Sequence, residues 1–297
     1  MSNPNPNNTE DLTKAPETFK RRLHTPRIIA IEGLDGTGKE STAKAVLRKA
    51  EADGIRAQMI SFPRYGTPTG DACDAFQRGK FGDPSSVDPF LAASFYSVDR
   101  LDWFSHDDFY QNLRGNELLI LDRSYYSNFI HQAMKCTSMK TLVDWMQRNF
   151  VIECKEAMTK WHGAFFEVYY LQLSEEDRQA QMANRTNQDG NETNLDYQRR
   201  CNEFIQWSQS RFFVNSLYDE LRFTGREPWF YGIWNAYIRR VRSIPVTHAQ
   251  RAEDVAAAVD ATADRIYHLA TRDPHILVQE YDYIPGVPKL PKFYPKW

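Results

Sequence analysis

Short apolar runs alternate with longer segments of helical spacing from Arg27 to about residue 270. The runs are short enough for strands, and the longer segments repeat their apolar positions every three or four residues, as amphipathic helices do. This alternation predicts an α/β fold in which a parallel sheet is flanked by helices. The predicted strands cover residues 28–32, 55–63, 117–122, 164–174 and 238–246. The predicted helices cover residues 39–54, 85–104, 124–160, 175–184, 195–210 and 252–270, and one more is expected after Gly70.

Both ends of the chain and two internal segments depart from this alternation. Residues 1–25 are rich in Asn, Pro and Thr, which predicts a flexible arm outside the folded domain of residues 26–270. Within that domain, the polar segment 185–194 is either a plain loop or a mobile lid. Residues 211–237 have the character of an aromatic-rich insertion. The tail 271–297 contains several prolines, which exclude a long helix and favour an extended path over the surface.

The composition is that of a globular domain with little net charge. Of the 297 residues, 41% are hydrophobic and 26% are charged, which suits a domain with one large core. The formal net charge is -2, so the chain has no overall attraction for nucleic acid or for an anionic membrane, and neither partner is expected. Any phosphate-binding site must therefore be built locally.

The cysteines, the apolar runs and the N-terminus indicate the cellular compartment of the protein. The four cysteines lie far apart in the sequence, which favours reduced structural thiols. No apolar run approaches the roughly 18 to 20 residues of a membrane span. The N-terminus lacks the basic-then-apolar pattern of a signal peptide. The expected location is the cytoplasm.

The turn 33-GLDGTGK-39 has the spacing G-x-x-x-x-G-K and lies between a predicted strand and a predicted helix, as a phosphate-binding loop requires. Its glycines let backbone N–H groups face phosphate oxygens, and Lys39 is placed to reach the transferred phosphate. A chance glycine-rich turn is the alternative, and Lys39 argues against it. The expected fold is of the P-loop NTPase type. The residues predicted to bind ATP are Gly33, Asp35, Gly36, Thr37, Gly38, Lys39, Glu40, Ser41 and Thr42.

Asp122 closes the apolar run 117–122 and is followed by a second charged residue. A carboxylate at the end of a strand beside a phosphate loop can hold Mg²⁺ directly or through water. Arg123 is then placed to contact phosphate. A salt bridge at the strand end is the alternative, and the phosphate loop favours the functional interpretation.

Four blocks of the sequence resemble the thymidylate kinase family and follow the family's order. They are 33-GLDGTGK-39, 62-FPRYGTPTG-70, 96-YSVDRLDWF-104 and 121-LDRSYYSNFIHQAMK-135. Weaker resemblance continues through residues 185–198, where the family's lid lies, and through the final helix. The resemblance implies transfer of the γ-phosphoryl group of ATP to dTMP, with Mg²⁺ required, by an enzyme that forms a homodimer.

The end of the second predicted strand agrees with a monophosphate acceptor. A nucleoside kinase must deprotonate a sugar hydroxyl and needs a carboxylate base near this point, whereas a phosphate acceptor is already ionised. Here the strand runs into 61-SFPR-64, and the cation of Arg64 suits a phosphate better than a hydroxyl.

The resemblance also implies roles for single residues. Tyr96 and Arg100 are four apart and share a helix face, so one can lie under the thymine while the other reaches the phosphate region of the acceptor. Arg185 would swing from the lid over the bridging phosphates, with Arg178, Arg199 and Arg200 as alternatives. The residues expected to act in catalysis are Lys39, Arg100, Asp122, Arg123 and Arg185.

The acceptor site expected from the resemblance places Phe62 and Gln132 at the base and Asp35 at the sugar 3′-hydroxyl. For each of them local scaffolding is the alternative, with Asp35 as a turn former and Gln132 as a residue that faces solvent. For Tyr96 the alternative is an ordinary core aromatic. The full set of expected acceptor residues is Asp35, Phe62, Arg64, Tyr96, Arg100, Arg123 and Gln132.

Three positions depart from the family's pattern. Glu40 stands where a Ser or Thr hydroxyl normally reaches magnesium, so the expected metal ligands are Asp122 and Glu40. Alternatively, Glu40 points away and water replaces the hydroxyl, or turnover is impaired. Ser124 and His131 replace aromatic residues, which makes the base less certain than the reaction.

Three functions therefore stay open. Transfer from ATP to dTMP is favoured, because Lys39, Asp122, Arg100 and Arg123 are all present. A related acceptor is the second interpretation: dUMP, a 5-modified dUMP or a deoxynucleoside. The third is a nucleotide-binding module without catalysis, in which the magnesium site is degraded.

Overall fold

The computed structural model describes residues 26–105, 116–150, 153, 165–174, 176–177, 195–208, 211–225, 241–246 and 252–271. The predictions for the arm 1–25, the lid 185–194 and all but the first residue of the tail 271–297 fall outside these residues, as does Arg185.

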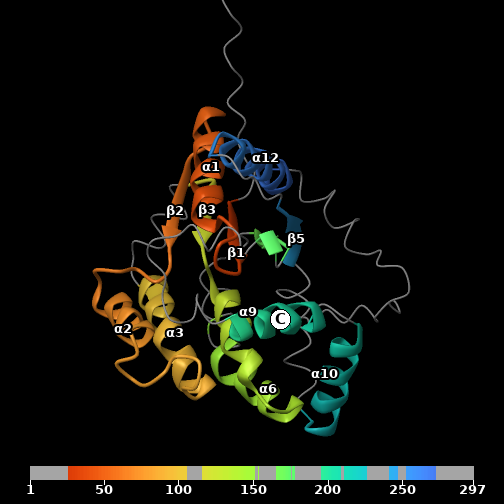
Figure 1. Ribbon diagram of the computed structural model, residues 1–297. Coiled ribbons are helices and arrows are strands. Elements are labelled where there is room, and N and C mark those ends of the chain that lie inside the picture. Colours follow the sequence, from red (N-terminus) through yellow and green to blue (C-terminus); the bar gives the residue numbers. More distant parts are fainter. Residues whose placement is uncertain are drawn as a thin grey trace, which may run out of the picture.

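Five parallel strands form one sheet, in the order β2-β3-β1-β4-β5 (Figure 1). The strands are β1 Arg27–Gly33, β2 Ala57–Ser61, β3 Leu118–Asp122, β4 Phe165–Gln172 and β5 Val241–Pro245. Parallel neighbours require crossover connections, and helices lie between the strands in the sequence. The predicted parallel sheet with flanking helices is confirmed.

The helices account for most of the other described residues. They are α1 Lys39–Ala52, α2 Pro68–Gln77, α3 Pro89–Ser105, α5 Tyr125–His131, α6 Met139–Trp145, α9 Leu195–Ser208, α10 Arg211–Phe223 and α12 Ala252–Ala270. A 3-10 turn, η1 Ala133–Lys135, follows α5, and a π-helical turn, η2 Met146–Phe150, continues α6. Within the described residues, no helix combines the length and apolar character needed to cross a membrane.

Two apolar cores cover the two faces of the sheet. Alternate residues of β1 point to opposite faces, so Ile28 belongs to one core and Ile29 to the other. The smaller core packs the sheet against α1 and α12, which lie side by side in Figure 1 and are joined by an ion pair between Lys49 and Asp264 of 2.7 Å. The larger core packs the opposite face against α3, α5, α6, α9 and α10. A sheet covered on both faces has strands that are buried throughout and apolar at their centres, as β1 and β3 are.

The helix expected after Gly70 begins two residues earlier, at Pro68. The hydroxyl of Thr67 caps it by accepting a hydrogen bond from the Gly70 amide (3.1 Å), and proline suits the first helical position. Gly70 is required inside the helix because a Cβ there would lie 2.0 Å from the Arg64 carbonyl oxygen. The glycine marks a close approach of two segments and not a helix boundary.

The helical stretch expected over 124–160 is divided, and the segment after 210 is helical. Ser138 caps a new helix by accepting a hydrogen bond from the Thr141 amide (3.1 Å), which separates α6 from α5. The expected insertion 211–237 begins with α10, whose Phe213, Leu217 and Leu221 are buried in the larger core. Their spacing of four residues places them on one helix face, so α10 is part of the fold.

Two of the three phenylalanines of α10 test this assignment. Phe213 is fully buried beside Trp207, with ring centroids 4.5 Å apart, whereas Phe223 is 89% exposed. Phe213→Ala is expected to lower the free energy of unfolding by about 3–5 kcal/mol, the usual cost of a large cavity. Phe223→Ala makes the same chemical change on the same helix and should leave that free energy nearly unchanged. Urea unfolding measures both, and equal effects of the two substitutions would contradict the packing of α10.

Candidate active site

An open cavity of about 190 Å³ lies at the carboxyl ends of β1, β2 and β3, where α/β proteins commonly bind ligands. Its lining comes from the phosphate loop, the segment after β2, and helices α2, α3, α5 and α9. Six of the seven residues predicted for the acceptor site line it: Asp35, Phe62, Tyr96, Arg100, Arg123 and Gln132. The fold therefore brings together residues that are up to 97 positions apart in the sequence (132 minus 35).

The phosphate loop has the tight path that its glycines predict. A Cβ at Gly33 would lie 2.6 Å from the Thr37 hydroxyl and 2.9 Å from the Leu171 carbonyl oxygen, so a larger residue cannot stand there. The Thr37 hydroxyl closes the turn by donating to the Leu34 carbonyl (2.8 Å). Gly38 adopts the left-handed conformation at the start of α1. The first amides of α1 therefore point out of the helix end beside the loop, as an anion site requires.

Lys39 is buried inside this loop. Its ammonium group donates to the Leu34 carbonyl (2.8 Å) and lies 3.5 Å from Asp35 Oδ1. Burial, with the nearby Arg123, lowers the pKa of Lys39 to about 8, and the Asp35 carboxylate opposes that shift. The side chain lies at the loop and can meet an incoming phosphate there.

An ion pair between Asp35 and Arg123 joins the phosphate loop to the end of β3, at 2.7 Å. Arg123 has a φ of 67°, which is uncommon for a residue with a side chain, and its amide donates to the Ile31 carbonyl (3.1 Å). Burial raises the pKa of Asp35, but Lys39 and Arg123 outweigh it and hold that pKa well below its usual range. Asp35 is therefore a carboxylate at every physiological pH.

Asp122 ends β3 directly beside β1, where it pairs in register with Ile31. Its Oδ1 atom is buried and has no hydrogen-bond partner in the described part of the chain. Burial raises the pKa of this carboxyl, while Arg123 and Lys39 lower it in part. An unsatisfied buried carboxylate oxygen needs a cation or water, so the residue fits the predicted magnesium ligand. No group of three or more His, Cys, Asp or Glu side chains that could hold a metal occurs among the residues described.

Glu40 is near enough for its charge to raise the pKa of Asp122, but its own side chain faces solvent. Its side chain is 64% exposed and pairs with Lys44, one helical turn later on α1, at 2.5 Å. Ser41 is also exposed, whereas Thr42 is buried and its amide donates to the Gly38 carbonyl (2.9 Å). This pairing favours the alternative in which Glu40 points away from the metal, and the role of Glu40 stays a prediction.

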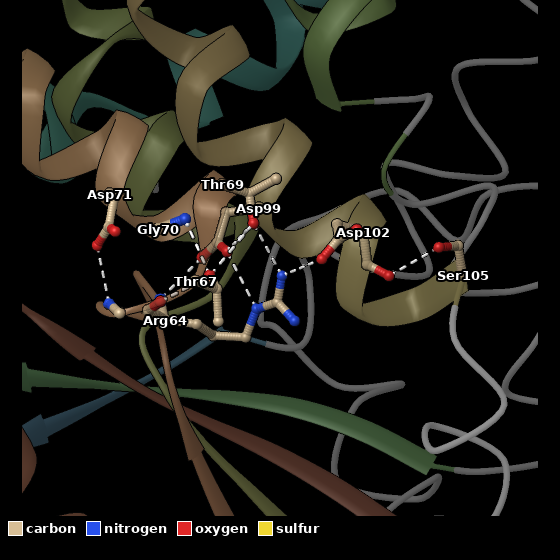
Figure 2. A network of polar contacts seen from close by, with 9 residues as sticks. Arg64, Thr67, Thr69, Gly70, Asp71, Asp99, Asp102 and Ser105 are labelled. Atoms are coloured by element: carbon tan, nitrogen blue, oxygen red, sulfur yellow. Dashed lines mark hydrogen bonds and ion pairs between the residues drawn. The ribbon is translucent and has the colours of Figure 1, made fainter.

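Arg64 is absent from the lining of the cavity, although it was predicted to bind the acceptor. Figure 2 shows its guanidinium held by two carboxylates of α3, with Nε 3.0 Å from Asp99 Oδ1 and Nη2 2.5 Å from Asp102 Oδ2. Nη2 also donates to the Thr69 hydroxyl (3.0 Å). Because this cation is already paired within the protein, it gives no support for a phosphate acceptor over a hydroxyl.

Arg100 does line the cavity, and it also has a buried acidic partner. Its guanidinium forms a two-point ion pair with Glu153, with Nε–Oε2 and Nη2–Oε1 distances of 2.5 and 2.9 Å. Glu153 was missed at the sequence level, since nothing in its local sequence relates it to an arginine 53 positions away.

Three further residues that were predicted for the acceptor site line the cavity. Phe62 lies edge-on to Trp103, with ring centroids 5.6 Å apart. The Tyr96 hydroxyl accepts a hydrogen bond from Gln77 Nε2 (3.2 Å). Gln132 Oε1 accepts one from the Lys135 ammonium group (2.8 Å).

The two other departures from the family's pattern have different surroundings. His131 lines the cavity and stacks on Tyr197 of α9, with ring centroids 6.0 Å apart. Burial lowers the pKa of His131 to about 4, so the ring is neutral near pH 7. Ser124 instead lies behind the cavity, where its hydroxyl donates to the buried Glu32 (2.7 Å) and caps α5. The expectation that Ser124 affects the base therefore has no support.

Helix α9 contributes residues that the sequence analysis overlooked. Tyr197 lines the cavity, and Gln198 Nε2 donates to Asp35 Oδ2 (3.4 Å). Among the alternatives to the lid arginine, Arg199 lies on the exposed side of α9 and pairs with Asp196 and Glu203. The helical periodicity of α9 could have identified its buried face but not the cavity against which that face packs.

Known proteins are similar to this chain over much of its length. The family model for thymidylate kinase matches residues 31–221. The thymidylate kinase of Mycobacterium tuberculosis (strain ATCC 25618 / H37Rv) is 32% identical over 126 residues, which are 41% of this chain and 56% of that protein. The putative thymidylate kinase of Aeropyrum pernix is 29% identical over 109 residues, 36% of this chain and 50% of that protein. The chain thus spans about half the length of the curated relatives it matches.

A solved structure shows the fold independently of close sequence similarity. The structure of thymidylate kinase from Candida albicans superposes with a TM-score of 0.52 at 16% identity, over 86% of this chain and 93% of that one. This likeness identifies the P-loop NTPase-type fold. Since the family model covers well over half of the 297 residues and includes every described side chain of the cavity, the chain belongs to the thymidylate kinase family.

Proposed function

We propose that the protein transfers the γ-phosphoryl group of ATP to dTMP, which gives ADP and dTDP. The ion pair between Asp35 of the phosphate loop and Arg123 of the acceptor cavity is the observation that carries this proposal. It supports the proposal because it joins a loop suited to a nucleoside triphosphate to a cavity suited to a second nucleotide. Two adjoining sites of this kind are what phosphoryl transfer between nucleotides needs.

In the proposed reaction, a phosphate oxygen of dTMP attacks the γ-phosphorus of ATP, and the bond from that phosphorus to the β,γ-bridging oxygen breaks. Lys39, the loop amides and Arg123 would stabilise the charge that develops on the transferred group. Magnesium, when bound, would neutralise phosphate charge, and Asp122 is the side chain that would hold it. Neither bond change requires a covalent intermediate on the protein.

The charges around the cavity favour a phosphate acceptor over a sugar hydroxyl. A hydroxyl must lose its proton to a base, whereas a monophosphate is already ionised. Asp35 is the acidic side chain in the cavity lining of the described chain, and its pKa lies well below the usual range. A carboxylate with so low a pKa is a weak base, which supports the monophosphate. Arg64 is paired elsewhere, so the support for a monophosphate acceptor comes from the low pKa of Asp35 and not from the cation of Arg64.

The identities of the donor and the acceptor rest on membership of the family. Related acceptors such as dUMP or a 5-modified dUMP carry the same hydrogen-bonding edge of the base and the same phosphate, so they stay alternatives. The non-catalytic module is less favoured, because Lys39 lies in the loop and Asp122 keeps an unsatisfied oxygen beside it. The homodimer, the cytoplasmic location and the role of Arg185 in a lid stay predictions.

Steady-state assays with ATP, Mg²⁺ and a panel of acceptors test the proposal. We expect turnover of dTMP and little or none of thymidine. Lys39→Met should lower kcat by about 100-fold or more, the usual effect of removing a group that stabilises transition-state charge. Lys140→Met removes a lysine exposed on α6 and should leave kcat unchanged. Turnover of thymidine but not of dTMP would overturn the proposal, and tight dTMP binding without any turnover would favour the module.

The magnesium dependence of turnover separates Asp122 from Glu40. Asp122→Asn removes the charge of the buried carboxylate and should lower kcat by about 100-fold or more at any Mg²⁺ concentration. Glu40→Ser should change kcat by less than about threefold, because Glu40 faces solvent and pairs with Lys44. An inactive wild-type protein that Glu40→Ser restores would show instead that Glu40 blocks the metal site.

The affinity for ATP is expected to fall as the pH rises above about 8. The free protein loses the Lys39 proton near that pH, while the bound triphosphate favours the protonated form. The dissociation constant should therefore increase by up to about tenfold per pH unit between pH 8 and 10. Calorimetric titration with a non-hydrolysable ATP analogue measures it. In Lys39→Arg the cation persists at high pH. The affinity of this variant for the ATP analogue, although lower overall, should therefore not change between pH 8 and 10. A dissociation constant of the wild type that does not change over the same pH range would contradict the prediction.

A further inference from the structure

Glu32 is a buried carboxylate that the proposed reaction does not use. It lies on β1 directly before Gly33, where the phosphate loop opens, and its side chain is 0% exposed. Its Oε1 accepts hydrogen bonds from the Ser124 amide (2.6 Å), the Ser124 hydroxyl (2.7 Å) and the Ser127 amide (3.2 Å). Its Oε2 accepts from the Ser127 hydroxyl (2.7 Å). All of these donors belong to the segment that begins α5.

Glu32 is not the counter-ion of a cation in the described part of the chain. The arginines that line the cavity pair there with Asp35 and Glu153, and neither forms an ion pair with Glu32. Burial raises the pKa of Glu32, and the hydrogen bonds from Ser127 and Ser124 oppose that shift. Since a buried carboxylate is costly, the role of Glu32 lies in the hydrogen bonds that it accepts.

The segment that Glu32 binds carries one wall of the acceptor cavity. The lining residues on α5 and at its C-terminal end are Ser127, Asn128, His131 and Gln132. The hydrogen bonds to Glu32 fix the start of this helix against the residue that precedes the phosphate loop. The positions of the donor loop and of the acceptor wall are therefore set together.

A second contact joins the same two segments, but it is open to ligands. Asp35 and Arg123 form their ion pair of 2.7 Å at the cavity, and both residues line it. A bound nucleotide can compete for either partner, because phosphates and hydroxyls bind such charged groups. Glu32 is fully buried and is not part of the cavity lining, so its hydrogen bonds persist when the cavity is occupied.

We propose that Glu32 is a positioning residue, which holds the acceptor helix α5 at a fixed place relative to the phosphate loop and thereby aligns the two nucleotides for phosphoryl transfer. Transfer needs the acceptor oxygen in line with the γ-phosphorus, and a displacement of about 1 Å can lower its rate by about 100-fold. The inference rests on the proposed function and extends it, because it assigns the alignment to a residue outside the cavity lining.

Glu32→Met and Glu32→Gln test the proposal, because both remove the charge and keep the approximate size of the side chain. Glutamine keeps an oxygen that accepts from both amides, and its nitrogen can donate to the Ser127 hydroxyl, whereas the methionine sulfur is a weak acceptor. We expect Glu32→Met to lower the single-turnover rate of transfer by about 100-fold, with both substrates saturating. Glu32→Gln should lower that rate by less than about tenfold.

Binding is measured separately, by calorimetric titration with dTMP and with a non-hydrolysable ATP analogue. The lining residues of α5 move as one unit, so the dissociation constant for dTMP should rise by less than about tenfold in Glu32→Met, and that for the ATP analogue by less than about threefold. Equal losses of rate in Glu32→Met and Glu32→Gln would assign the effect to the charge of Glu32 and would overturn the proposal.

Glu167→Met is the matched control. Glu167 is a second buried glutamate of the same sheet, and it pairs with Arg242 Nε (3.2 Å) and accepts from the Tyr169 hydroxyl (2.6 Å), outside the cavity lining. This control should lower the melting temperature, as Glu32→Met also should, but leave the rate of transfer unchanged. A purely structural role of Glu32 would make the two methionine variants alike and would overturn the proposal.

The outcomes separate this inference from the proposed function. If the wild type does not phosphorylate dTMP, the proposed function fails. If it does and folded Glu32→Met keeps the wild-type rate of transfer, the Glu32 inference alone is overturned. Should Glu32→Met not fold, Ser124→Ala removes one hydroxyl donor to Glu32 and the cap of α5, without a change in the cavity lining. It should lower the rate of transfer by about three- to tenfold with both dissociation constants unchanged, and an unchanged rate would equally overturn the inference.

Discussion

The pairing of β1 with β3 is the constraint on which the site depends. The parallel register places Asp122 beside Ile31, two residues before the glycine that opens the phosphate loop. The next residue, Arg123, then reaches Asp35 across the junction, in a backbone conformation that is costly for a residue with a side chain. A shift of one residue in this register would turn Asp122 to the other face of the sheet. The pairing of β1 with β3 therefore sets the positions of the phosphate loop, of the Asp122 carboxylate and of Arg123 at the cavity.

The second feature is that the cations in and next to the site, which are buried or half-buried, have acidic partners. Arg123 and Lys39 share Asp35, Arg100 binds Glu153, and Arg64 binds two carboxylates of α3. Burial of an unpaired charge is costly, and a bidentate or shared pair offsets that cost. Pairing also fixes where each guanidinium points. The three arginines therefore differ in role. Arg123 is paired at the phosphate loop, Arg100 lines the cavity, and Arg64 links α2 to α3.

Much of the fold could be predicted from the sequence, because strand and helix periodicities are local properties of the chain. The phosphate loop, the strand that ends at Asp122 and the amphipathic helix near the C-terminus were all found in this way. The errors have local causes as well. Gly70 was taken for a helix boundary although a close contact with the Arg64 carbonyl requires it, and the cap at Ser138 was missed within a long helical pattern.

The sequence by itself determined the class of the site: a phosphate loop, a carboxylate at the end of a strand, and aromatic and basic side chains at helical spacing. Only the tertiary structure decided which charges are available. Glu40 turns to Lys44, Arg64 turns to α3, and Glu153 meets Arg100 from 53 positions away. The physical reason is that backbone periodicity depends on neighbours in the chain, whereas the partner of a buried charge depends on neighbours in space. A motif can place an arginine on a helix, but the packing around it decides what that arginine can bind.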